Sequence, residues 1–159
     1  MALSLDEIDV RLLKELETDA DRPNVELARI VGLSPAATLN RVRRMKEAGV
    51  IRRITARLDS ATVGFALQVY LLVTLGRHDE AGDRRFAAEV AKLDNVIAAD
   101  GVAGEIDAIL LVVAHDVAEL QVTLSRLMTR GGAQRVITVL RLQEIKPSSP
   151  LPIRATRIR

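Results

Sequence analysis

The chain has 159 residues, of which 48% are hydrophobic and 28% charged, which suffices for one ordinary domain or two small ones. It contains no cysteine, and this excludes disulfide bonds, thiolate metal sites and cysteine nucleophiles. No apolar run is long enough to cross a membrane and no signal-peptide pattern follows Met1, so we expect a cytoplasmic protein without membrane contact.

The net charge of +2 is unevenly distributed along the chain. Residues 1–30 hold eight acidic and four basic side chains, whereas residues 41–57 hold seven basic side chains and one acidic side chain. A basic stretch inside an otherwise acidic chain is typical of proteins that bind phosphate groups. The alternative is an ordinary solvated helix face.

Two short helices are predicted in the first 31 residues. A helix over residues 6–18 is favoured by Asp6 as N-cap and by apolar residues at helical spacing. The segment DADRP ends it, and Asn24 is expected to cap a second helix. The apolar face of this second helix comprises Val25, Leu27, Ala28 and Val31, and a tight turn at Gly32 follows.

A third helix is predicted over residues 35–48, with Ser34 as N-cap and Pro35 in the first helical position. Its first turn has no acid, although helix starts usually carry one, so we infer that nucleic acid supplies the anion. At about 100° per residue, one side is expected to pack on the first two helices: Thr38, Leu39, Val42 and Met45. The opposite side is small and then basic: Ala36, Ala37, Asn40, Arg43 and Arg44, with Arg41 on its flank.

This third helix suits insertion into the major groove of double-stranded DNA. Ala and Asn side chains can contact thymine methyl groups and adenine edges, and Arg can read guanine or hold phosphates. Residues 50–58 alternate well enough for a small strand or wing, whose Arg52, Arg53 and Arg57 would contact the DNA backbone. The predicted DNA-binding residues are Ser34, Pro35, Ala36, Ala37, Asn40, Arg41, Arg43, Arg44, Arg52 and Arg53.

The N-terminal third resembles the winged helix-turn-helix of the Lrp/AsnC (feast/famine) transcriptional regulators. Two segments carry the resemblance, LDEIDVRLLKEL and NVELARIVGLSPAATLNRVRRMKEAGVIRRITARLD. The resemblance implies a DNA-binding domain over residues 1–58, and the segment DSATVG over residues 59–64 is expected to be a hinge. A three-helix interaction module is the alternative.

The second half is predicted to form a four-stranded sheet with two helices, in the order βαββαβ. Strands are expected over residues 66–75, 96–102, 107–114 and 136–144. Phe86, Val90 and Leu93 form the inner face of the first helix, and Asp116 caps the second. This order is that of a ferredoxin-like domain over residues 65–146, so the fold class is α+β. The helices cover one face of the sheet, and we expect a homodimer to bury the other.

The turn between the second and third strands is the predicted effector site: Gly101, Val102, Ala103, Gly104, Glu105, Ile106 and Asp107. Glycines let backbone N–H groups approach a carboxylate, and Asp107 can pair with an α-ammonium group; plain hairpin chemistry is the alternative. The second half resembles the ligand-sensing, oligomerising domain of Lrp/AsnC proteins, in which this turn contributes to an amino-acid site between subunits. The resemblance implies an amino-acid effector, no other cofactor, and a homo-oligomer: a dimer, or a tetramer or octamer of dimers.

Two features depart from the family pattern. Residues 130–135, RGGAQR, replace a Pro-Gly-Val-like entry into the last strand, so assembly beyond a dimer is not carried over. Ala108 stands where an aromatic residue is common, so the identity of the effector is not carried over either. The tail over residues 147–159 is expected to be extended because of its prolines, and either packs across a neighbouring subunit or is mobile.

Catalysis and metal binding have little support in the sequence. His78 and His115 lie at element boundaries without the spacing of metal ligands, and the common nucleotide-binding and nucleophile motifs are absent. We therefore expect neither an enzyme nor a metal site. Two hypotheses remain: a regulator whose DNA affinity or assembly responds to a small effector, and an architectural DNA-binding protein that needs none.

Overall fold

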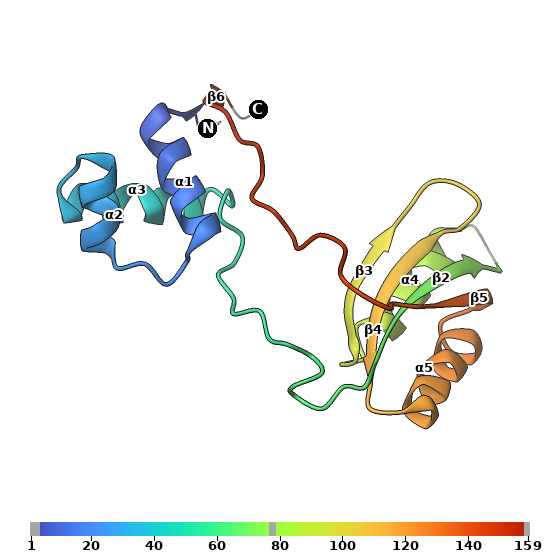
Figure 1. Ribbon diagram of the computed structural model, residues 1–159. Helices are drawn as coiled ribbons and strands as arrows, with labels where there is room; N and C mark the ends of the chain where they lie inside the picture. Colours follow the sequence, from blue (N-terminus) through green and yellow to red (C-terminus); the bar gives the residue numbers. More distant parts are fainter. Residues whose placement is uncertain (1–3, 77–78, 158–159) are drawn as a thin grey trace. The chain divides into compact units, whose positions relative to one another are not determined.

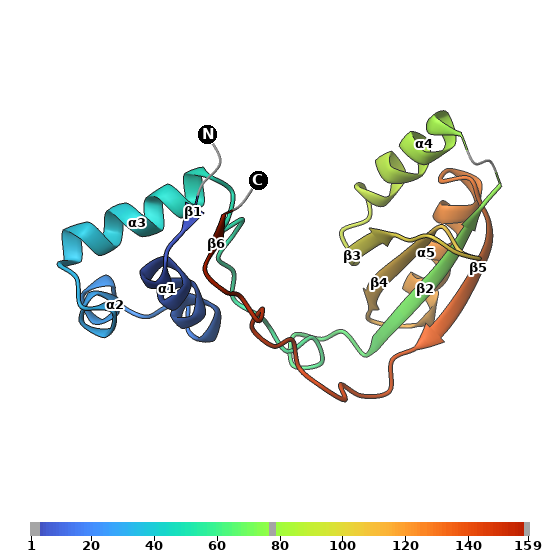
Figure 2. The same ribbon diagram turned by 90° about the horizontal axis from the view of Figure 1, so that it is seen from above.

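The computed structural model describes residues 4–76 and 79–157, which form two compact units (Figures 1 and 2). The first unit contains the chain up to Ala56 together with the residues from Lys146 on. The second unit spans Arg57–Ile145. None of the helices in the described ranges is long and apolar enough to cross a membrane.

Three helices build the first unit: α1 (Glu7–Thr18), α2 (Asn24–Val31) and α3 (Pro35–Glu47). Asp6 caps α1 in a reciprocal capping box with Asp9, as the role of Asp6 in the sequence predicted. Gly32 ends α2 with a φ of 73°, a left-handed conformation that suits glycine, so the predicted turn is confirmed. The core between the helices contains Leu5, Val10, Leu12, Leu13, Leu27, Val31, Val42 and Met45.

Two side chains assigned to this core are exposed instead. Val25 is 68% exposed and Leu39 is 57% exposed. For Val25 the reason is helical geometry: at about 100° per residue it points about 160° away from Leu27 and about 120° away from Val31, so it lies at the edge of the packed face of α2 and remains in solvent. The expected cap of α2 is also different, because Pro23 is the N-cap and the Asn24 side chain donates to the backbone oxygen of Pro35 at 2.8 Å.

The predicted wing is not formed. Residues 52–58 have no strand in the structure, and the β structure described in this unit consists of β1 (Ser4–Leu5) and β6 (Thr156–Arg157), which pair antiparallel. A strand needs a neighbour for its backbone groups, and here the segment that finds one comes from the end of the chain. In both ribbon views β6 lies beside β1 (Figures 1 and 2).

The tail therefore belongs to the N-terminal unit. The N–H of Leu151 donates to the carboxylate of Glu17 at 3.1 Å, and Ile153 packs against the core of this unit. The segment is extended, as its prolines predicted, but within this chain it is docked on the helices. The sequence did not predict this docking of the tail within its own chain.

The second unit is a four-stranded antiparallel sheet covered by two helices, and the predicted βαββαβ order is confirmed. Its elements are β2 (Leu67–Leu75), α4 (Glu80–Val90), β3 (Val96–Gly101), β4 (Ala108–Ala114), α5 (Val117–Thr129) and β5 (Ala133–Leu140). The sheet order is β3-β4-β2-β5. Alternate residues of β2 and β4 pack against Phe86 of α4 and against Leu120 and Leu127 of α5, so one face of the sheet carries the core.

The last strand is displaced from its predicted position. β5 covers Ala133–Leu140, whereas residues 136–144 were expected. Its partner β2 starts at Leu67, so residues beyond Arg141 have no neighbour to pair with. Asp79 and Asp116 cap α4 and α5 through the N–H groups of Gly82 and Glu119. His78, which the sequence placed in the turn before α4, lies outside the described residues.

An ion pair joins the two helices of this unit. Arg126 of α5 donates to the buried carboxylate of Glu89 on α4 through Nε and Nη2, both at 2.8 Å. The Arg126 guanidinium holds the pKa of Glu89 below its usual value, against the opposing effect of burial. The pair fixes α4 against α5, and α4 forms one wall of the pocket described below.

Candidate nucleic-acid interface and ligand pocket

The start of α3 has the geometry of an anion-binding helix end. The Ser34 side chain accepts a hydrogen bond from the N–H of Ala37 at 3.2 Å, and Pro35 occupies the first helical position. No acidic residue lies in the first turn, and Ser34, Pro35 and Ala36 are exposed. The partial positive charge of this helix end is therefore open to a phosphate group.

The exposed face of α3 carries Ala36, Asn40 and Arg43 side by side. At about 100° per residue, these three side chains fall within an arc of about 60°. Arg43 donates to the side-chain oxygen of Asn40 at 3.1 Å and lies 3.8 Å from the carboxylate of Glu47. Leu39 borders the same surface and adds an exposed apolar group to it. Such a mixture can contact both base edges and thymine methyl groups.

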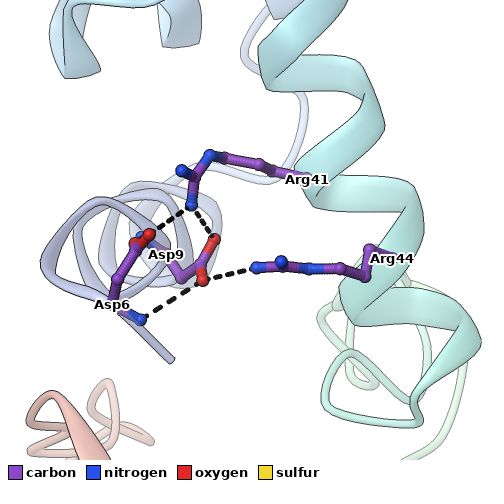
Figure 3. A network of polar contacts seen from close by, with 4 residues as sticks. All are labelled: Asp6, Asp9, Arg41 and Arg44. Atoms are coloured by element: carbon purple, nitrogen blue, oxygen red, sulfur yellow. Dashed lines mark hydrogen bonds and ion pairs between the residues drawn. The ribbon is translucent and has the colours of Figure 1, made fainter. Parts of the chain in front are cut away.

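Two of the predicted DNA-binding arginines have partners inside the protein (Figure 3). Nη1 of Arg41 lies 2.7 Å from Asp6 and 2.9 Å from Asp9, and Nη2 of Arg44 lies 2.7 Å from the other oxygen of Asp9. Sequence reasoning missed this network. Its signal is present in the chain as two acids three positions apart in the start of α1 and two arginines three positions apart in α3, but nothing in the sequence shows that they face one another.

The network shifts the titration of its outer members. The backbone N–H of Asp9 is the main cause that holds the pKa of Asp6 below its usual value, and Arg41 adds to this effect. Hydrogen bonds to Asp6 and Asp9 raise the pKa of Arg41. Asp6 and Arg41 are thus charged at neutral pH, and part of the positive charge of α3 is neutralised within the protein.

The remaining predicted basic contacts lie in the segment after α3. Arg52 and Arg53 are exposed, and the N–H groups of Val50 and Ile51 donate to the oxygen of Met45, which fixes the chain as it leaves the helix. Arg57 instead donates to the carboxylate of Glu144 at 2.7 Å. Arg52 and Arg53 are therefore exposed on a segment that forms no strand.

A second candidate site lies in the C-terminal unit, where a cavity of about 710 Å³ opens between α4 and the turn after β3. Four of the seven predicted effector residues line it: Gly101, Val102, Ala103 and Asp107. Gly104, Glu105 and Ile106 do not line this cavity. Sequence reasoning missed the contribution of β2 and α4: Leu75 of β2 lines the cavity, as do Asp83, Phe86, Ala87 and Val90 of α4 and its C-cap Ala91.

Asp107 has a defined structural position in this turn. Its carboxylate accepts the N–H of Leu75 at 2.7 Å, and its own N–H donates to the oxygen of Val73 at 2.8 Å. The N–H of Val102 donates to the oxygen of Asp107 at 2.9 Å, which closes the turn. Asp107 therefore fixes the wall of the cavity. Within the described ranges, no group of three or more His, Asp or Glu residues could hold a metal ion, and His115 is hydrogen-bonded to Glu119 at 2.7 Å.

Both units of the chain are similar to known protein domains. The model of the AsnC-type helix-turn-helix domain matches residues 5–46, and that of the Lrp/AsnC ligand binding domain matches residues 68–151. A leucine-responsive regulatory protein of Rhizobium meliloti is 36% identical over 152 residues, which cover 95% of this chain and 97% of that protein. The chain belongs to the Lrp/AsnC family of transcriptional regulators.

Other Lrp/AsnC proteins are similar over nearly their whole length. The HTH-type transcriptional regulator AldR of Mycolicibacterium smegmatis is 35% identical over 151 residues, covering 94% of this chain and 88% of its own. A solved structure of the transcriptional regulator NMB0573 from Neisseria meningitidis, in complex with L-Met, has a TM-score of 0.85 and 31% identity, with 94% of this chain and 97% of that chain covered. The family consists of transcriptional regulators, not enzymes, so this Lrp/AsnC protein is a DNA-binding transcription regulator with a ligand-binding domain.

Proposed function

We propose that this Lrp/AsnC regulator changes its DNA affinity or its assembly when an amino acid binds in the cavity beside Gly101–Asp107. The single observation that carries the proposal is the cavity itself, because it lies at the turn whose residues the sequence singled out. A regulator of this kind acts where DNA is accessible, and we place it in the cytoplasm.

The lining of the cavity suits an amino acid with an apolar side chain. Leu75, Phe86 and Val90 offer an apolar wall, and Asp83 and Asp100 add acidic groups that can attract an α-ammonium group. Exposed backbone at Gly101 lets N–H groups approach a carboxylate. The neighbouring structure from Neisseria meningitidis was solved with L-Met, and several relatives are named leucine-responsive, which supports the same ligand class for this chain.

The test is a titration of the amino acids with and without DNA. DNA binding and effector binding must be thermodynamically linked. An amino acid that changes the affinity of the protein for DNA by some factor must itself bind more tightly or more weakly by the same factor when DNA is present. We expect apolar amino acids to give this linkage and acidic ones not to. If no amino acid alters DNA binding, assembly or thermal stability, the protein acts on DNA without an effector and the proposal fails.

Asp107 gives the sharper mutational test. Asp107→Ala is expected to abolish the response to the amino acid while basal DNA binding stays near normal. Because the carboxylate also accepts the N–H of Leu75, Asp107→Asn separates the two roles: it keeps an acceptor for Leu75 but removes the charge that would pair with an ammonium group. Asp94→Asn, an exposed acid in the same unit, is the matched control. If D107N responds fully to the amino acid, the α-ammonium group of the ligand does not pair with Asp107.

We also propose that the free face of the sheet is a homodimer interface. Tyr70 pairs with Leu111 and Val139 across the sheet, and Leu72 pairs with Ile109 and Ile137. These side chains alternate with those of the core and so lie on the face opposite α4 and α5, where Tyr70, Ile137 and Val139 are exposed. A continuous apolar surface on a sheet favours burial against a second copy. A dimer also suits an operator with two half-sites.

A further inference from the structure

The buried carboxylate of Asp9 joins α1 to α3. Asp9 has no exposed surface, and both of its carboxylate oxygens accept hydrogen bonds. Oδ1 accepts from Arg41 at 2.9 Å, and Oδ2 accepts from Arg44 at 2.7 Å and from the N–H of Asp6 at 3.3 Å. A buried carboxylate is costly unless it is paired and hydrogen-bonded, so these contacts are required for Asp9 to remain where it is.

The two arginines reach Asp9 from successive turns of one helix. Arg41 and Arg44 are three positions apart, and Figure 3 shows both guanidinium groups converging from α3 on the start of α1. Arg41 makes a further contact to Asp6 at 2.7 Å. Two anchor points along a helix restrict both its rotation about its own axis and its sliding along the partner helix. Asp9 therefore determines which face of α3 is turned outward.

The outward face is the one that carries Ala36, Asn40 and Arg43. If α3 turned about its own axis by the angle between successive residues, about 100°, Asn40 would point away from the major groove of bound DNA. Arg44 is itself half exposed, so it has two incompatible uses: to hold Asp9 or to read a base. Base contacts need side chains held within a narrow range of positions, which favours the first use.

We propose that Asp9 is a positioning residue for DNA recognition, and that Arg44 acts through Asp9 rather than by reading a base. This inference rests on the DNA-binding function stated above. Simple electrostatics gives the opposite expectation: removal of a carboxylate near a polyanion raises affinity. The sign of the change in affinity therefore distinguishes positioning from charge repulsion.

The test uses the full-length chain and DNA that the unmodified protein selects from a random-sequence pool, with a scrambled duplex as reference. Asp9→Asn removes the charge and keeps the shape. Glu7→Gln removes a charge from the same first turn of α1, where Glu7 is exposed. We expect D9N to lose about tenfold in affinity for the selected duplex and E7Q to lose none. A D9N protein that binds the selected duplex as tightly as the unmodified protein, or more tightly, overturns the proposal.

A double-mutant cycle with Arg44→Gln tests the role of Arg44. If Arg44 acts through Asp9, the variant with both changes binds no more weakly than D9N alone. If Arg44 contacts DNA directly, the fold losses in affinity caused by D9N and by R44Q multiply in the double variant, and the proposal is overturned. Thermal unfolding of each variant shows whether it folds.

Should D9N fail to fold, R44Q alone decides the question by its salt dependence and by where in the selected site selectivity is lost. Loss of a direct phosphate contact reduces the slope of log affinity against log salt by about one, and loss of a direct base contact relaxes selectivity at the single base pair that Arg44 reads. Loss of positioning instead leaves the slope unchanged and lowers selectivity at several base pairs of the selected duplex. An unmodified protein that enriches no DNA from the pool contradicts the DNA-binding function itself, which is a different result from either.

Discussion

The backbone N–H of Leu151 donates to the carboxylate of Glu17 across 134 positions of the chain, at 3.1 Å. This contact, the packing of Ile153 and the pairing of β6 with β1 make the last segment of the chain a structural part of the DNA-binding unit. The tail that follows the ligand-binding sheet in sequence therefore packs against the helical unit that precedes the sheet.

The tail should stabilise the N-terminal unit. We expect Ile153→Ala to lower the free energy of unfolding of this unit by about 1–2 kcal/mol, because part of an apolar side chain leaves the core. Leu151→Ala is the matched control: Leu151 is 64% exposed, so its truncation should change stability little. Amide hydrogen exchange of α1 during denaturant titration reports on this unit specifically. Equal protection of α1 in both variants would mean that the docked tail contributes no stability.

Stability at low pH should depend on Glu89 and Arg126. The pKa of Glu89 is lowered in the folded protein by Arg126, so the pair contributes stability above the ordinary Glu pKa of 4.5, and this stability is lost as pH falls through the lower folded pKa. Arg126→Met should therefore lower the stability of the folded protein at neutral pH. It should also reduce the further loss of stability that occurs as the pH falls below 4.5. Thermal unfolding measured at a series of pH values tests this.

The control for that experiment is Arg84→Met, which removes an exposed ion pair with Glu80 on the same helix. Exposed pairs contribute little, so this variant should follow the pH dependence of the unmodified protein. Identical pH profiles for R126M and R84M would contradict the assignment of acid sensitivity to Glu89.

Arg43 should contribute to the selectivity of DNA binding as well as to its affinity. It lies on the exposed face of α3 beside Asn40, and we expect Arg43→Ala to weaken binding to a selected duplex by about 1–3 kcal/mol and to reduce selectivity among bases. Arg84→Ala, on α4, makes the same change outside the DNA-binding unit and should leave affinity unchanged. Fluorescence anisotropy with selected and scrambled duplexes measures both quantities. Weakening of both duplexes by one common factor would make Arg43 a phosphate contact instead.

The proposed homodimer should depend on Leu111, which pairs with Tyr70 on one side and Ala98 on the other. A charge buried in an apolar interface without a partner is strongly unfavourable, so Leu111→Asp should yield a monomer at micromolar concentration. Val122→Asp is the control, because Val122 is exposed on α5, away from that face. Sedimentation velocity distinguishes the outcomes. An unmodified protein that sediments as a monomer would remove the dimer altogether.

Local sequence was sufficient for most of the secondary structure. Apolar spacing and capping residues predicted α1 and α3 to within a residue at each end, and Asp6, Ser34 and Asp116 are N-caps as predicted. The order of strands and helices predicted the ferredoxin-like sheet. These features depend on neighbours within a few positions, and periodicity records such neighbours directly.

What only the tertiary structure decided involves pairs of groups that are distant in sequence. The pairing of Asp9 with Arg41 and Arg44, the docking of Ile153, and the contribution of Phe86 to the cavity wall have no local signature. The basic residues of α3 and its acid-free first turn predicted an electropositive helix. They could not predict that Asp9, 32 positions before Arg41, would pair with that arginine and neutralise part of the charge. Charge patterns along a chain give the number of ionic groups; only the packing of helices determines which of them face water and which face one another.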